Sequence, residues 1–194
     1  MRRCSSRNLW TKEAVAAKVK NIDLLSHNSY TISRFSGRII GIDPSLRGTG
    51  FAVIDIYKSQ EAQLIFSKTL KMSPKYTQSE CVLKIAEDIY ASCCEYGPCV
   101  ASMEQAIYVQ NFQTTQILGM ARGAAMVSLA RRRIDLYEYA PLRIKQAVVG
   151  FGQAKKDQVA AMIRSILKLE KELPFDESDA CAAALCHAFS LKIS

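Results

Sequence analysis

GIDPSLRGTGFAVI, at residues 41–54, joins two apolar runs through a short polar turn. The first run, RIIGIDPS at 38–45, is stopped by Pro44, and a short apolar run bounded in this way predicts a buried strand. Further runs follow across short polar loops, FAVIDIY at 51–57 and LIFSKTLKM at 64–72, and this spacing predicts antiparallel neighbours. The folded part of the chain is therefore predicted to begin with a three-stranded meander.

Helical and strand patterns alternate after the meander. Apolar residues recur at helical spacing in four segments and form short runs in two others. Helices are predicted at 79–94, 113–133, 154–168 and 178–192, and strands at 99–105 and 134–140. Three antiparallel strands followed by strand–helix units predict an α/β fold, in which helices flank a five-stranded mixed sheet.

The composition is that of a globular protein with a basic beginning. Of the 194 residues, 49% are hydrophobic and 23% are charged, which excludes wholesale disorder and fibrous structures. The net charge is +8, but residues 1–38 hold eight Lys or Arg and only two acidic residues. We therefore predict a flexible basic extension at 1–37 and a nearly neutral folded domain at 38–194.

Three interpretations of the basic extension remain open. It is a disordered tail, an arm that contacts DNA, or an organelle transit peptide, since Arg and Ser are common in it and acids are scarce. No stretch approaches the ~18 apolar residues of a membrane span, and no secretory signal is recognisable, so we expect no membrane association.

The cysteines indicate a reducing compartment rather than a metal site. The chain has seven cysteines without a C-x-x-C pair and only two histidines, so a structural zinc site is not expected. Cys181 and Cys186 lie in an apolar helical pattern and are predicted to be core residues. A cytoplasmic location fits best.

Four carboxylates are placed to meet at one edge of the predicted sheet. Asp43 and Glu104 end two predicted strands, and Asp176 and Asp179 are three residues apart where the last helix begins. Strand ends at one edge of an α/β sheet gather ligand sites, and residues at i and i+3 share a helix face. These four acids are candidate catalytic and metal-binding residues.

Clustered carboxylates repel one another unless a cation compensates them. Hard oxygen ligands select Mg²⁺ or Mn²⁺, and two such ions can hold the attacking water and the leaving oxygen of a phosphodiester. Simpler roles stay open as well. Asp176 can cap the last helix, Asp179 can stabilise its first turn, and Glu104 can be a solvated residue at a strand end.

The segment at 41–54 resembles the opening of the RuvC family of Holliday-junction resolvases, which have the RNase H-like fold. Further blocks resemble the same family in the same order: MEQ (103–105), LGMARGAAM (118–126), YAPLRIKQAVVGFGQAKKDQV (139–159) and FDESDACAAALCHA (175–188). The resemblance covers about residues 38–190. The first motif recurs across the RNase H-like superfamily, so the resemblance to the RuvC family in particular rests on the whole set of blocks in this order.

The resemblance implies an enzyme that cuts DNA. It implies a homodimer that makes symmetric nicks in two strands of a four-way junction during recombination and repair, beside a RuvA–RuvB branch-migration complex. It also implies two Mg²⁺ ions in each active site, with Mn²⁺ as a substitute. The family's metal ligands correspond to Asp43, Glu104, Asp176 and Asp179.

Two positions depart from the family pattern. Ser45 stands where the family usually has glycine, and its side chain restricts the backbone conformations that the turn can adopt. Ile107 stands where the family often has an aromatic residue that meets DNA bases near the crossover. Here the aromatic residue is Tyr108, one position later, so both residues are candidate DNA contacts.

Basic residues before the last helix are candidate phosphate contacts. They are Arg143, Lys145, Lys155 and Lys156. Between them, the apolar and Gly-rich VVGFG at 148–152 predicts an exposed loop that approaches DNA closely. The alternative is that these are ordinary solvated residues. In the helix at 113–133, small residues allow a close helix contact, either in a dimer or on the protein's own sheet: Ala121, Gly123, Ala124 and Ala125.

Three function classes remain: a junction-resolving endonuclease, an RNase H-like nuclease acting on structured RNA, and a non-catalytic junction-binding protein. The long block at 139–159 favours the first class over the second. The presence of all four acids favours the first over the third, because without metal they would only repel phosphate.

Overall fold

The computed structural model describes residues 35–106 and 111–190. The chain divides into two units, Met1–Ser33 and Arg34–Ser194, and every described residue lies in the second. The boundary predicted between residues 37 and 38 stays a prediction. Within the described part, no helix is both long and apolar enough to cross a membrane.

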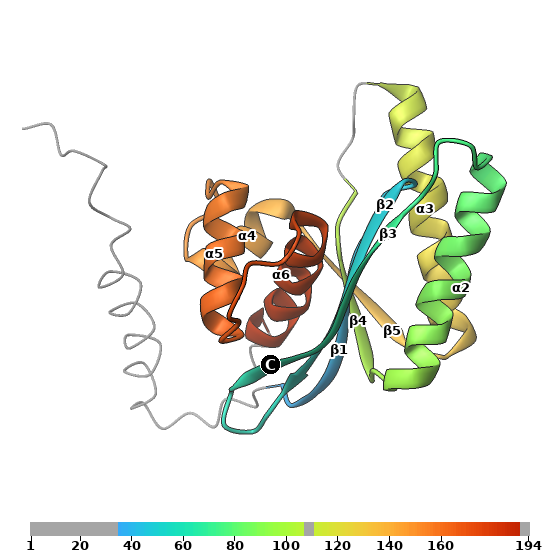
Figure 1. The fold of residues 1–194 in the computed structure, drawn as a ribbon. Coiled ribbons are helices and arrows are strands. Elements are labelled where there is room, and N and C mark those ends of the chain that lie inside the picture. The colour runs from blue at the N-terminus through green and yellow to red at the C-terminus, as the bar shows by residue number, and fades with distance from the viewer. Residues whose placement is uncertain (1–34, 107–110, 191–194) are drawn as a thin grey trace, which may run out of the picture. The chain divides into compact units, whose positions relative to one another are not determined.

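A five-stranded mixed sheet forms the centre of this unit (Figure 1). Its strands lie in the spatial order β3 (Ala62–Lys71), β2 (Gly48–Ile56), β1 (Gly37–Asp43), β4 (Val100–Glu104) and β5 (Asp135–Tyr139). β1 pairs antiparallel with β2 and β2 with β3, whereas β1–β4 and β4–β5 are parallel pairs. This arrangement confirms the predicted meander and the predicted fold class.

The helices of the described residues cover both faces of the sheet (Figure 1). One face carries α2 (Gln78–Tyr96) and α3 (Phe112–Arg131), and the other carries α4 (Pro141–Val149), α5 (Lys156–Ile166) and α6 (Phe175–Ser190). Between the sheet and α2–α3 lies a core of fully buried side chains that includes Ile40, Phe51, Ile85, Met103 and Leu129.

Two glycines let α6 pack closely on the sheet. A Cβ at Gly41 would lie 1.9 Å from the Ala180 carbonyl oxygen, and a Cβ at Gly50 would lie 2.1 Å from that of Asp176. Any larger residue at either position would therefore push the helix away. The helix contributes Cys181 and Cys186 to the buried interior, as the sequence predicts. This contact fixes where the first turn of α6 lies relative to the strand ends.

The predicted VVGFG loop is wrong in its first half. Val148 and Val149 are buried in α4, and Gly150, at φ +89°, ends that helix. Pro141 presets the first turn, and Ile144 and Val148, four residues apart, both point into the core. A helix of nine residues shows little more than two turns of this pattern, and its last two valines run directly into GFG, so the segment VVGFG predicts a loop.

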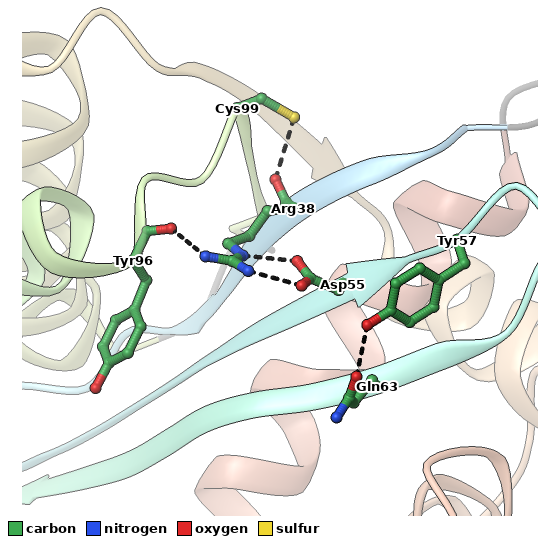
Figure 2. A network of polar contacts seen from close by, with 6 residues as sticks. All are labelled: Arg38, Asp55, Tyr57, Gln63, Tyr96 and Cys99. Carbon is green, nitrogen blue, oxygen red and sulfur yellow. Dashed lines mark hydrogen bonds and ion pairs between the residues drawn. The ribbon is translucent and has the colours of Figure 1, made fainter.

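A polar network holds the other end of β1 (Figure 2). The Arg38 guanidinium donates to both carboxylate oxygens of Asp55, at 2.6 and 2.7 Å, and to the Tyr96 carbonyl oxygen at 2.6 Å. One arginine therefore joins β1, β2 and the end of α2. Because β1 runs away from this network toward Asp43, the network and the candidate carboxylates lie at opposite ends of the strand.

Candidate active site

Two candidate acids end neighbouring parallel strands. Asp43 is the last residue of β1 and Glu104 the last residue of β4. The pairing of β1 with β4 ends at Ile42 and Met103, so both acids lie one residue beyond the last pair between these two strands. Parallel strands end at the same edge of a sheet, and this geometry brings the two carboxylates together as predicted.

α6 adds the third and fourth acids. Asp179 lies with Asp43 and Glu104 in a pocket of about 380 Å³. We call it the carboxylate pocket; its charged lining residues are Asp43, Glu104, Arg122, Lys145, Lys156 and Asp179. Asp176 is not among its lining residues. Its Oδ2 lies 3.6 Å from where a Cβ of Gly48 would stand, although its charge still acts on Asp43.

Burial and the neighbouring negative charges disfavour the ionised form of Asp43 and Glu104. Burial, followed by the negative charges of Asp179 and Glu104, raises the pKa of Asp43 to about 7. Burial and the charge of Asp179 also raise the pKa of Glu104. A pKa rises in this way when the ionised form lacks a compensating cation, so the pocket is electrostatically suited to receive one.

A lysine supplies part of the positive charge. Lys156 Nζ donates to Asp179 Oδ2 at 2.9 Å, and this hydrogen bond raises the pKa of the lysine. The Lys156 and Lys145 charges both lower the pKa of Glu104, against the effects of burial and Asp179. Two of the three predicted lysines, Lys145 and Lys156, therefore act on the acids of the pocket.

The other predicted DNA contacts lie elsewhere. Lys155 is exposed and precedes α5 as its N-cap, and Arg143 donates to Ser190 Oγ at 3.2 Å on the surface. Neither lines the carboxylate pocket. Ile107 and Tyr108 lie outside the described residues.

Sequence reasoning assigned no role to one residue of the pocket, Arg122. Its side chain comes from α3, on the opposite face of the sheet from α6, and reaches the pocket beside Glu104. A signal was present, because Arg122 is the single charged residue within LGMARGAAM, a block of small and apolar residues. An arginine in such a block needs partners.

The donor set fits a hard divalent cation. Within residues 35–106 and 111–190, no group of three or more His, Cys, Asp or Glu side chains is already arranged to hold a metal ion. The acids that converge on the pocket nevertheless offer only carboxylate oxygens, which suit Mg²⁺ or Mn²⁺ better than the His- and Cys-containing sets typical of zinc. The raised pKa values of Asp43 and Glu104 have the same two causes, burial first and then the negative charge of the neighbouring acids.

Comparison with known sequences gives consistent results. A family model described as crossover junction endodeoxyribonuclease RuvC matches residues 39–187. The crossover junction endodeoxyribonuclease RuvC of Bordetella parapertussis is 40% identical over 151 residues, which are 78% of this chain and 82% of that protein. The protein of the same name from Ehrlichia ruminantium is 36% identical over 156 residues, 79% of this chain and 98% of that protein.

Solved structures agree with the sequence comparison. Thermus thermophilus RuvC is 30% identical, with a TM-score of 0.72 over 78% of this chain and 93% of that one. The structure of T. thermophilus RuvC in complex with a Holliday junction substrate is also 30% identical, with a TM-score of 0.75 over 79% of this chain and 93% of that one. The chain, with its carboxylates at the ends of β1 and β4, belongs to the RuvC family of crossover junction endodeoxyribonucleases.

Proposed function

We propose that this chain is a metal-dependent endonuclease that resolves four-way DNA junctions by paired symmetric nicks during homologous recombination and repair. The observation that carries the proposal is the meeting of Asp43, Glu104 and Asp179 in one pocket beside two lysines. Membership of the RuvC family supports the substrate, since a T. thermophilus member was solved with a Holliday junction.

The carboxylates are proposed to bind two Mg²⁺ ions, with Mn²⁺ as a substitute. Bound ions would activate a water and stabilise the charge that develops on the phosphodiester. Asp43, Glu104 and Asp179 would hold them, with Asp176 completing the set from the first turn of α6. Lys156 would leave Asp179 for a phosphate oxygen, and Lys145 would neutralise a second phosphate at the rim.

The test of this function is a cleavage assay with matched substrates. The purified protein is incubated with a four-way junction, a linear duplex of the same sequence and a structured RNA, each with Mg²⁺ and with chelator. We expect symmetric nicks in the junction only, and only with Mg²⁺. Cleavage of the RNA, or junction binding with no cleavage under any metal condition, would refute the proposal.

The two lysines of the pocket are expected to contribute phosphate contacts. Lys145→Ala and Lys156→Ala should each reduce the slope of log affinity against log salt concentration by about one unit, because one counterion fewer is released on binding. Lys168→Ala is a matched control, since that lysine is 76% exposed and pairs with Glu61, away from the pocket. An unchanged slope in both pocket variants would show that these lysines do not contact DNA.

Assembly as a homodimer is proposed because two symmetric nicks need two active sites related by a two-fold axis. An apolar groove of about 600 Å³ lies between α2 and α3, and Leu83 and Val127 line it while remaining 58% and 57% exposed. Ala121, Ala124 and Ala125 belong to the buried core that the sheet forms with α2 and α3, and of the four small residues Gly123 and Ala124 line the groove. We propose that a second copy of the chain covers this groove.

Leu83→Glu is expected to convert the dimer to a monomer, because a charge would then be buried against an apolar surface. Sedimentation measures the change, and junction cleavage should lose its paired character. Leu142→Glu is the control, since Leu142 is 63% exposed on α4, on the other face of the sheet. A Leu83→Glu protein that stays dimeric would place the interface elsewhere.

We further propose that the protein acts beside a RuvA–RuvB complex in the bacterial cytoplasm. The six cysteines within the described residues are all free thiols, which supports a reducing compartment. Organelle targeting by residues 1–37 is the alternative, and that segment lies almost wholly outside the described residues.

A further inference from the structure

Arg122 is held inside the protein rather than presented to solvent. Its side chain is only 12% exposed, although arginine is among the residues least often buried. It lies on α3 and lines the carboxylate pocket, next to the end of β4. A buried guanidinium needs partners for its N–H groups, and the identity of those partners indicates its role.

Both ends of the guanidinium are occupied by protein groups. Nη1 donates to the main-chain carbonyl oxygen of Glu104 at 2.6 Å, and Nη2 forms an ion pair with Glu138 on β5. Arg122 thus joins α3, the last residue of β4 and the neighbouring strand. Because Nη1 and Nη2 each have a protein partner and the side chain is only 12% exposed, a DNA phosphate would have to compete with these contacts for the guanidinium.

The main chain at Glu104 depends on this contact. β1 and β4 pair up to Ile42 and Met103, so Glu104 lies past the end of that ladder. On the other side it is paired with Tyr139, whose carbonyl oxygen accepts from the Gln105 N–H at 2.8 Å. Arg122 supplies the remaining support, because it fixes the Glu104 carbonyl and hence the peptide plane that follows the side chain.

We propose that Arg122 is a positioning residue, which holds the end of β4 so that the Glu104 carboxylate enters the pocket in a fixed direction. This inference rests on the proposed function, in which Glu104 binds metal. Groups that orient a metal ligand through a hydrogen bond typically change metal affinity or activity by about 10–100-fold when they are removed.

The experiment compares Arg122→Gln and Arg122→Lys with the wild type. We expect the maximal rate of junction cleavage to fall, or the Mg²⁺ concentration for half-maximal rate to rise, by about 10–100-fold in Arg122→Gln. Junction affinity should stay within about twofold, since no phosphate contact is lost. Arg122→Lys should recover part of the loss. Its ammonium group can bind either the Glu104 carbonyl oxygen or Glu138, but it lacks the planar guanidinium that binds both.

Arg38→Gln is the matched control. Arg38 also holds one carboxylate, Asp55, and one main-chain carbonyl, that of Tyr96, but at the far end of β1 (Figure 2). Its loss should lower the melting temperature without changing the maximal cleavage rate or the Mg²⁺ requirement. Glu138→Gln should weaken cleavage less than Arg122→Gln, and combining the two changes should add little, because both act through one contact.

A readout without DNA separates this inference from the proposed function. Mg²⁺ should raise the melting temperature of the wild type and of Arg38→Gln, and should do so only at higher concentration for Arg122→Gln. If the wild type responds to Mg²⁺ but cuts no junction, the proposed function fails and the role of Arg122 stands. A folded Arg122→Gln protein with unchanged rate and Mg²⁺ requirement would overturn the inference, and so would a weakened junction affinity with a reduced salt slope.

Discussion

Asp43→Asn and Glu104→Gln should each lower the rate of junction cleavage by more than about 100-fold, since residues that merely support metal ligands already cost 10–100-fold. Each change removes an anionic ligand and nearly keeps the side-chain volume, so the fold should persist. Junction binding should persist or tighten, because one charge that repels phosphate is removed from the pocket. Single-turnover cleavage with Mg²⁺ and binding with chelator measure the two effects separately.

Glu177→Gln provides the control for this pair. Glu177 is an acid next to Asp176 on α6, but its carboxylate accepts hydrogen bonds from Ser67 and Thr69 on β3, at 2.5 and 3.2 Å. It does not line the carboxylate pocket. We expect its amide variant to cleave at nearly the wild-type rate. Near-normal cleavage by either Asp43→Asn or Glu104→Gln would refute the assignment of the site.

Strand ends made the centre of the site predictable. Asp43 and Glu104 directly follow apolar runs, which predicts two acids at strand ends, and because β1 and β4 are parallel neighbours in the sheet these ends meet. Asp179 follows from helical spacing at the start of the last helix. These predictions need only the period of the apolar pattern and the position of each acid relative to it, and both are local properties of the sequence.

Other parts of the site depend on tertiary contacts that no local pattern encodes. Helical spacing places Asp176 and Asp179 on one face, but Asp176 lies against β2 beside Gly48, and only Asp179 lines the pocket. Arg122 reaches the pocket from the opposite face of the sheet, past the end of β4. Neither arrangement can be read from spacing, because each depends on how closely a helix approaches the sheet.

α4 shows a different limit of prediction from sequence, which is the short length of the helix. The last two of its nine residues, Val148 and Val149, run directly into GFG, so the apolar and Gly-rich VVGFG predicts a loop. The decisive residues, Ile144 and Val148, give one helical repeat. A single repeat cannot be distinguished from chance until the partners that bury it, on α5 and α6, are known.

The metal-free protein should become more stable when Asp43 is replaced by asparagine. Burial and the nearby acids raise the pKa of Asp43 from 3.8 in the unfolded chain to about 7 in the folded protein. The folded protein therefore binds this proton more tightly than the unfolded chain does. The contribution of this proton to the free energy of unfolding is lost as the pH rises through the range from about 4 to about 7. Above that range the ionised Asp43 destabilises the fold by at most about 4 kcal/mol, because each pKa unit corresponds to about 1.36 kcal/mol.

Asp43→Asn removes this penalty, so at pH 8 with chelator its melting temperature should exceed that of the wild type by about 5–10 °C, the shift that 2–3 kcal/mol gives in a domain of this size. The difference should shrink as the pH falls from about 7 and should vanish only below the unfolded-state pKa of 3.8, where the wild-type carboxyl is protonated in both states. Mg²⁺ should raise the melting temperature of the wild type more than that of the variant, because the variant has lost a ligand.

Asp55→Asn tests whether the effect belongs to the pocket or to any half-buried aspartate of the sheet. Asp55 lies on β2 and is held by the Arg38 guanidinium at 2.6 and 2.7 Å, so its negative charge is compensated (Figure 2). Replacing it leaves Arg38 without its carboxylate and should lower the melting temperature at pH 8, the opposite sign to Asp43→Asn. If both variants lose stability, the charge of Asp43 is already compensated within the protein, and the pocket has no electrostatic need for a metal ion.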